Sequence, residues 1–214
     1  MTIADRVKIY LDNDFVIRKA LSKNIISLRA LSRYLCDVLE LDQKNIHAVM
    51  SAIRRYKKED KTKRDKELKN VFSKSTIKTR SNIVDICIAK NKVNQENLNK
   101  FNSKINIEKG DVLRIIQAEQ GIRLIIDEKN LDLFYNIFSQ KNISLEKDLT
   151  EINIQFTKEA SKVKGIVSLI TSSLSSEDIN LTEIMSSAPE LLIFIKNQDL
   201  LKALQVIDNI KNNI

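Results

Sequence analysis

Residues 162–199 read KVKGIVSLITSSLSSEDINLTEIMSSAPELLIFIKNQD, and this stretch carries the clearest signal of the fold class. Directly after Gly165, apolar residues recur at helical spacing over residues 166–174, which predicts an amphipathic helix that begins at the glycine. Four serines among residues 172–176 then end the apolar pattern. A glycine at the start of a helix lets the backbone turn sharply there, because it has no Cβ.

The segments on either side of this helix predict three strands and a second helix. Ile-Asn-Leu at residues 179–181 opens one strand, and Pro189 marks the turn that follows, since proline fixes φ and lacks an N–H. The apolar run at residues 191–195 indicates a buried strand. Apolar and polar residues alternate over residues 152–157, which is typical of a half-buried strand, and residues 200–207 fit a helix. The predicted order is β-α-β-β-α, with a last strand missing or very short.

This order, with glycine at the first strand-to-helix junction, resembles an ACT domain, in particular the regulatory ACT module of aspartate kinases. The resemblance covers roughly Leu149 to Ile210. It rests on Val163-Lys164-Gly165-Ile166, Ser172-Ser173-Leu174, Ile179-Asn180-Leu181, Glu183-Ile184 and Asp199-Leu200. The resemblance implies a ferredoxin-like sandwich that pairs side by side, so we expect a homodimer formed through these modules. It also implies that a free amino acid binds at the seam between modules, as it often does in this family.

The same order of elements is predicted in the preceding part of the chain, with helices at residues 95–105 and 131–138 and strands at residues 112–118 and 122–126. Three pairs of apolar residues in the two parts lie 69 positions apart: Leu131 and Leu200, Ile126 and Ile195, and Ile115 and Ile184. A constant offset of this kind indicates an internal repeat. The predicted fold class is therefore α+β. A helical, helix-turn-helix-like unit at residues 1–69 precedes two βαββα(β) modules, at residues 70–143 and 144–214.

The first module departs from the pattern of the second. It has Asn91-Lys92-Val93-Asn94 where the second has Val163 to Ile166, and Asp111-Val112 where the second has Asn180-Leu181. A side chain in place of the glycine would crowd a ligand, so the first module is predicted to be mainly structural. At its beginning, residues 71–79 and 83–88 predict two short strands, which form either a wing-like hairpin beside the helical unit or an extra edge strand.

The candidate ligand-binding residues are Ser161, Lys164, Gly165, Ile166, Asn180 and Leu181. The free N–H groups at the helix start, together with the positive end of the helix dipole, favour a carboxylate there. The amide of Asn180 can both donate and accept hydrogen bonds, which suits the amino and carboxyl groups of an amino acid. The competing interpretation is that Gly165 serves only the turn and that Asn180 is only a turn or edge-strand residue.

The segment at residues 1–69 is predicted to be entirely helical and carries most of the positive charge. It contains 17 of the 36 Lys and Arg residues and 10 of the 28 Asp and Glu residues, which leaves +7 of the net charge of +8 in this segment. Helices are predicted near the start, at residues 15–21, at residues 28–39 with Ser27 as N-cap, and at residues 45–57. The charge run at residues 57–69 either extends the last helix or links two domains, and its i,i+4 pairs favour a solvated helix.

Two segments of this unit resemble the helices of helix-turn-helix units in small archaeal regulators. They are SLRALSRYL at residues 27–35 and AIRRY at residues 52–56. If the unit binds DNA, we expect phosphate contacts from Arg29, Arg33, Lys44, Arg54, Arg55 and Lys57. Such binding would depend steeply on salt. Polar candidates for base contacts are Gln43, Asn45, His47 and Ser51.

Other chemistry finds little support in the sequence. The only histidine has no paired thiol or histidine beside it, so no metal and no cofactor are expected, and phosphate-binding or nucleophile motifs are missing. Cys36 and Cys87 are expected to be free thiols in a cytoplasmic protein without a leader or a membrane span. Two functions remain open, neither of them enzymatic. One is an amino-acid-responsive DNA-binding regulator, and the other is a non-catalytic allosteric or interaction subunit of an amino-acid biosynthetic enzyme.

Overall fold

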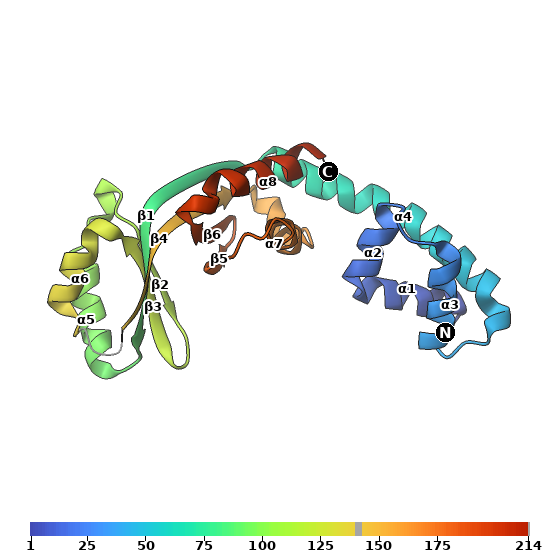
Figure 1. Ribbon diagram of the computed structural model, residues 1–214, viewed down its shortest axis with the longest axis horizontal. Coiled ribbons are helices and arrows are strands. Elements are labelled where there is room, and N and C mark those ends of the chain that lie inside the picture. The colour runs from blue at the N-terminus through green and yellow to red at the C-terminus, as the bar shows by residue number, and fades with distance from the viewer. Residues whose placement is uncertain (140–142, 214) are drawn as a thin grey trace. The chain divides into compact units, whose positions relative to one another are not determined.

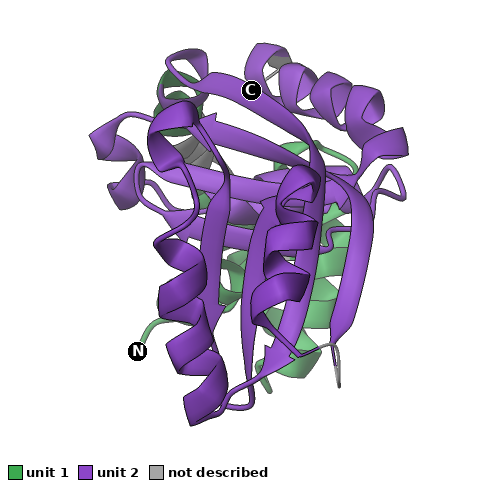
Figure 2. Ribbon diagram, turned by 90° about the vertical axis from the view of Figure 1, so that its left-hand side faces the viewer, with its two compact units in different colours: residues 1–70, 214 green, residues 71–213 purple. Residues whose placement is uncertain are grey.

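The computed structural model describes residues 1–139 and 143–213, without the side chains of residues 15, 19, 57–65 and 213. Contacts divide the chain into two compact units, residues 1–70 and residues 71–213 (Figure 2). The first unit contains only helices, and the second combines one antiparallel sheet with four α-helices. No helix among the described residues is both long enough and apolar enough to span a membrane.

The first unit is built from α1 (Ile3–Asn13), α2 (Phe15–Ser22), α3 (Leu28–Val38) and most of α4 (Ile46–Ser73). Thr2 and Asp5 form a capping box at the start of α1, and the hydroxyl of Ser27 accepts a hydrogen bond from the N–H of Ala30 at the start of α3. The prediction of Ser27 as N-cap is confirmed. The buried core of this unit consists of Val7, Leu11, Leu21, Leu31, Leu35, Cys36, Val49, Ala52, Ile53 and Tyr56.

Helix α4 continues through the mixed charge run, so the helical interpretation of residues 57–69 is confirmed. The prediction of two short strands at residues 71–79 and 83–88 is wrong in both of its versions, the wing-like hairpin and the extra edge strand, because one strand forms here and it lies inside the sheet. Val71 and Phe72 are buried residues of the last turns of α4, and a single strand, β1 (Thr76–Ala89), follows. Asn82 has φ of 60° and forms a bulge in β1, which pairs with β4 on both sides of it.

The second unit has a six-stranded antiparallel sheet in the order β2-β3-β1-β4-β6-β5. Helices α5 and α6 belong to the half with β1, β2 and β3, and α7 and α8 belong to the other half (Figure 1). The first half consists of β1, α5 (Lys92–Asn102), β2 (Leu113–Gln117), β3 (Gly121–Asp127) and α6 (Leu131–Ile137). The second consists of β4 (Ser144–Gln155), α7 (Ile166–Ser175), β5 (Glu183–Ser187), β6 (Glu190–Lys196) and α8 (Leu200–Asn213).

The two halves repeat the same order of elements, as the constant offset in the sequence predicts. Ile115 pairs with Leu124 in the first half, and Ile184 pairs with Ile193 at the equivalent place in the second. The central strands β1 and β4 each carry a bulge residue with positive φ, Asn82 in β1 and Asp148 in β4. These two residues lie 66 positions apart (148 − 82), slightly fewer than the 69 that separate the other equivalent residues. The connection between the first strand and the first helix is also longer in the second half, where it spans residues 156–165, than in the first, where it spans residues 90–91. No strand follows α8 within the described residues.

The sheet buries apolar residues on two sides. One core packs α5 and α6 against β1 and β3 and includes Phe101 and Phe134. Another core contains residues of both halves and none of the four α-helices: Ile83, Val112, Ile125, Leu149, Leu192 and Phe194. Partly buried ion pairs are also present in the sheet. Arg123 contacts Asp85 at 2.6 Å and Glu183 at 3.1 Å, and Arg114 contacts Glu151 at 3.2 Å. Two of these contacts, Arg123 to Glu183 and Arg114 to Glu151, join the two halves.

Candidate functional site

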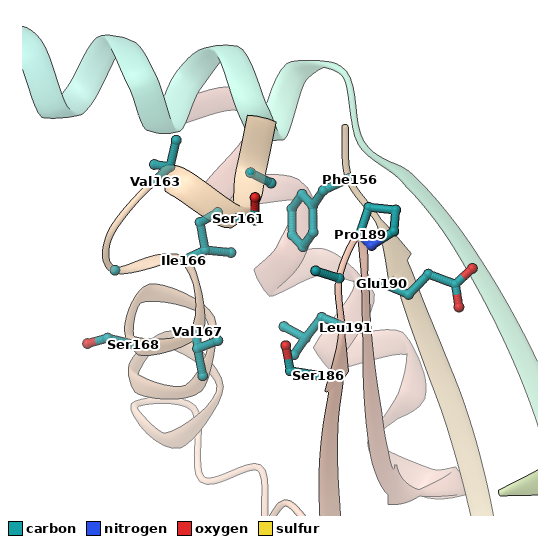
Figure 3. Close-up of a pocket in the computed structure, with 13 residues that line it drawn as sticks. Phe156, Ser161, Val163, Ile166, Val167, Ser168, Ser186, Pro189, Glu190 and Leu191 are labelled. Carbon is teal, nitrogen blue, oxygen red and sulfur yellow. The ribbon is translucent and has the colours of Figure 1, made fainter. Parts of the chain in front are cut away.

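A cavity of about 360 Å³ lies in the second half of the 71–213 unit, between the start of α7 and the β5–β6 hairpin (Figure 3). Its position follows from the strand register. Gln155 at the end of β4 pairs with Glu190 at the start of β6, so the chain leaves β4 beside the hairpin and enters α7 at the same end of the sheet. The lining residues are Phe156, Ala160, Ser161, Val163, Gly165, Ile166, Val167, Ser168, Ser186, Ala188, Pro189, Glu190 and Leu191.

One wall of the cavity is the start of α7. Gly165 is the N-cap and adopts φ of 91°, in the left-handed region that a side chain strains, so the sequence needs glycine here. Its carbonyl accepts the first helical hydrogen bond, from the N–H of Leu169 at 2.9 Å. Within the described part of the chain no side chain caps this helix. The N–H groups of its first turn are therefore available to an acceptor in the cavity.

The other wall is formed by Phe156 and the β5–β6 hairpin. The backbone N–H of Phe156 donates to the carbonyl of Pro189 at 2.8 Å, which fixes the end of β4 against the hairpin turn. Pro189 follows a cis peptide bond, and the prediction that it marks the turn is confirmed. Ser186 and Leu191 are paired across the hairpin, and both line the cavity.

The buried residues of the cavity lining are apolar, whereas two of its three serines are exposed and the third, Ser168, is half-buried. Phe156, Ile166 and Leu191 are buried, while Ser161 and Ser186 are exposed. Among the described lining residues, only Glu190 has an ionisable side chain. Its carboxylate accepts a hydrogen bond from the amide of Asn153 at 3.3 Å and points away from the cavity in Figure 3.

Of the six candidate ligand residues, the structure brings Ser161, Gly165 and Ile166 together at the cavity. Lys164 is exposed beside them and does not line it. Asn180 and Leu181 lie at the far end of the same half, because α7 carries the chain away from the hairpin before β5 begins. The N–H of Thr182 donates to the carbonyl of Phe194, near the end of β6 that is remote from the hairpin.

The prediction of a strand starting at residues 179–181 is also wrong, since β5 begins at Glu183. The lining residues that are not among the predicted ligand residues are Phe156, Ala160, Val163, Val167, Ser168, Ser186, Ala188, Pro189, Glu190 and Leu191. Pro189 and the β-α-β-β order could have pointed to them, because an antiparallel hairpin must return to the end of the sheet where the preceding helix starts.

The corresponding place in the first half is closed by side chains. Gln117 occupies the edge-strand position that Ser186 has in the second half. The amide of Gln95 on α5 donates to that of Gln117 at 2.9 Å, and the ammonium of Lys90 donates to the carbonyl of Ala118 at 3.0 Å. These contacts tie the start of α5 directly to the β2–β3 hairpin.

The start of α5 is also capped, unlike that of α7. The residue at its N-cap is Asn91, whose side chain accepts a hydrogen bond from the N–H of Asn94 at 2.8 Å. Asn91, rather than Val93, therefore takes the place of Gly165, which shifts the predicted alignment of the two modules. The connection from β1 to α5 consists only of Lys90 and Asn91, so no loop remains to line a cavity.

The helical unit presents a separate set of candidate residues. Arg29 and Arg33 are exposed on α3, and Arg54 and Arg55 are exposed on α4. None of these four forms an ion pair with a described residue. Lys44 is exposed and contacts Asp42 at 3.0 Å. The predicted contact Lys57 lies outside the described side chains. The polar candidates Gln43, His47 and Ser51 are exposed, and Asn45 is half-buried.

No protein-family model and no curated protein sequence matches this chain. Among solved structures it is similar to the aspartate kinase of Clostridium acetobutylicum, with a TM-score of 0.53 and 20% identity, over 64% of this chain and 34% of that one. The chain therefore spans about a third of that enzyme.

Two regulatory pieces of aspartate kinases match over nearly their whole length. A putative C-terminal regulatory domain from Porphyromonas gingivalis has a TM-score of 0.50 and 18% identity, over 65% of this chain and 98% of that one. The ligand-free regulatory subunit from Thermus thermophilus has a TM-score of 0.51 and 14% identity, over 62% and 95%. At these identities the similarity describes the fold alone, which over 62–65% of the chain is similar to that of aspartate kinase regulatory domains. This supports the predicted resemblance to an ACT-domain fold.

Proposed function

We propose that this chain is a non-catalytic regulatory protein in which the 71–213 unit binds a free amino acid and the 1–70 unit delivers the response. The observation that carries this proposal is the open cavity at the uncapped start of α7, in a fold shared with aspartate kinase regulatory domains. The Clostridium enzyme is described as an important allosteric enzyme, and the Thermus structure as a regulatory subunit.

The chemistry of the cavity suits the carboxylate of an amino acid. A carboxylate bound there would accept hydrogen bonds from the backbone N–H groups of the first turn of α7 and lie at the positive end of the helix dipole. Ser161, Gly165 and Ile166 are the predicted ligand residues at this place. Lys162 and Lys164 are exposed close by in sequence and add attraction for an anion. Asn180 and Leu181 could take part only from another copy of the chain, in the homodimer that we propose.

The response follows from a shift in population. A ligand that binds one arrangement of the dimer better than another shifts the equilibrium toward that arrangement. The shift in the equilibrium constant is limited by the ratio of the ligand's affinities for the two arrangements. In the preferred version of the proposal the output is DNA binding by a helix-turn-helix-like unit. The supporting observation is the set of four exposed arginines on α3 and α4 without an ion pair among the described residues: Arg29, Arg33, Arg54 and Arg55.

A second output has support of its own. The structures that match over nearly their full length are regulatory domains or subunits of an amino-acid biosynthetic enzyme. The chain can therefore act as a non-catalytic subunit that docks on a separate enzyme through its helical unit. Retention of such an enzyme on the immobilised chain, lost when the four arginines are changed to alanine, would favour this output over DNA.

The deciding experiment on ligand binding is a thermal-shift screen of the whole chain against the twenty amino acids. A ligand at about 100 times its Kd stabilises the folded state by about 2.7 kcal/mol, which is readily measured as a rise in Tm. A flat screen, confirmed by calorimetry, would remove the sensor function. For DNA, fluorescence anisotropy with a generic duplex at several salt concentrations should show affinity that falls steeply with salt, and less steeply after Arg54→Ala and Arg55→Ala.

A further inference from the structure

We infer that the cavity selects an amino acid whose side chain is uncharged and apolar. This rests on the proposed function, because it names the class of ligand for the same site. The cavity can discriminate between ligand side chains only if apolar and polar groups occupy different parts of its walls.

The floor of the cavity is apolar. The rings and branched chains of Phe156, Ile166 and Leu191 are buried there, at 8%, 8% and 2% exposure. Val163, Val167 and Pro189 extend the apolar lining from the two walls. A ligand side chain of matching character gains free energy by leaving water for this floor, roughly in proportion to the apolar area removed.

The rim of the cavity is polar and uncapped. Ser161 and Ser186 are exposed, and the first turn of α7 presents N–H groups without a capping side chain among the described residues. An amino acid placed with its carboxylate at the helix start and its ammonium toward solvent therefore directs its side chain to the floor. This orientation keeps both charges of the ligand backbone in the polar part of the site.

A charged ligand side chain would find no partner at the floor. Glu190 is the one ionisable residue in the described lining, and its carboxylate is turned toward Asn153. No arginine, lysine or histidine of the described residues lines the cavity, so an aspartate side chain would be equally unpaired. Burying a charged group without a partner is costly, so we expect the cavity to disfavour lysine and aspartate by at least about tenfold.

The test is isothermal titration calorimetry of the whole chain with L-leucine, L-isoleucine, L-lysine and L-aspartate. We expect leucine or isoleucine to bind at least about tenfold more tightly than lysine and aspartate. The same titration is repeated with Ser186→Gln, which places in the rim the residue that closes the first half at Gln117. The control is Ser187→Gln, since Ser187 is also an exposed serine of β5 but does not line the cavity.

Ser186→Gln should weaken binding by at least about tenfold and Ser187→Gln should leave it unchanged. If lysine or aspartate binds as tightly as leucine, the sensor function stands and the inference about the side chain is overturned. If both serine variants weaken binding equally, or neither does, the ligand lies elsewhere and the inference also falls. If none of the twenty amino acids binds, the proposed function fails together with it.

Discussion

The ring of Phe72 packs edge-on against the ring of Phe156, with 5.5 Å between the centroids and 88° between the planes. Phe156 lines the cavity, and Phe72 lies in the last turns of α4. The hydroxyl of Ser75 donates to the carbonyl of Phe72 at 2.7 Å, and the ammonium of Lys211 on α8 donates to the carbonyl of Ser75 at 3.2 Å. The end of α4 and the wall of the cavity therefore share one packed cluster.

Removing the ring of Phe72 should destabilise the chain. Phe72 is fully buried, so Phe72→Ala is expected to lower the free energy of unfolding by about 3–5 kcal/mol, through lost transfer energy and the void left beside Phe156. Urea denaturation followed by circular dichroism measures the change. The control is Leu201→Ala, because Leu201 is 76% exposed and its truncation should cost less than about 0.5 kcal/mol. Equal losses in the two variants would contradict the packing of Phe72.

Replacing Gly165 should strain the start of α7. With φ of 91°, Gly165→Ala is expected to destabilise the chain by about 1–2 kcal/mol, and Gly165→Asn by less, since asparagine tolerates the left-handed region better. Thermal unfolding compares the variants. Ligand binding should weaken in the same order, because the N–H groups of the first turn lose their alignment. An alanine variant as stable as the original chain would refute the strain at this position.

The chain should bind one amino acid molecule, not two. The cavity is present in the second half, whereas the corresponding place in the first is bridged by Gln95 and Gln117 at 2.9 Å. Calorimetric titration gives the stoichiometry directly. Two equivalent binding events per chain would show that the first half is not closed to ligand.

Stability should carry a pH dependence from two buried carboxylates, Asp85 and Glu151. Burial raises the pKa of both groups, although Arg123 and Arg114 counteract it. A carboxyl group whose pKa is raised in the folded state contributes stability that is full below its ordinary pKa and is lost as pH rises through the raised value. The free energy of unfolding should therefore lose this contribution as pH rises from about 4.

The measurement for this prediction is urea denaturation at several pH values above about 4, with the double variant Asp85→Asn and Glu151→Gln. As pH rises, the free energy of unfolding of the original chain should fall relative to that of the double variant, which lacks the two carboxyl groups. Glu177→Gln is the control, because Glu177 pairs with Lys202 at 3.6 Å on the surface and should alter the profile little. A double variant with an unchanged pH profile would count against the prediction.

The order of the elements and their repetition can be read from the amino-acid sequence alone. A continuous apolar run and a period of 3.6 residues are local signals, so the strand β6 and the helix α7 are recognisable from their own residues. The constant offset that relates Ile126 to Ile195 identifies the repeat without any knowledge of pairing. Gly165 is recognisable as the start of a helix because glycine permits the sharp backbone turn at that position, where the structure has φ of 91°.

Which residues meet at the cavity depends instead on tertiary contacts. The register of Gln155 with Glu190 brings the hairpin to the start of α7 and leaves Asn180 at the other end of the half. The same kind of pairing keeps β1 a single strand through the bulge at Asn82, where the local sequence pattern predicted two separate strands. Strand register depends on contacts between residues far apart in the chain, which a local pattern of apolar residues does not record.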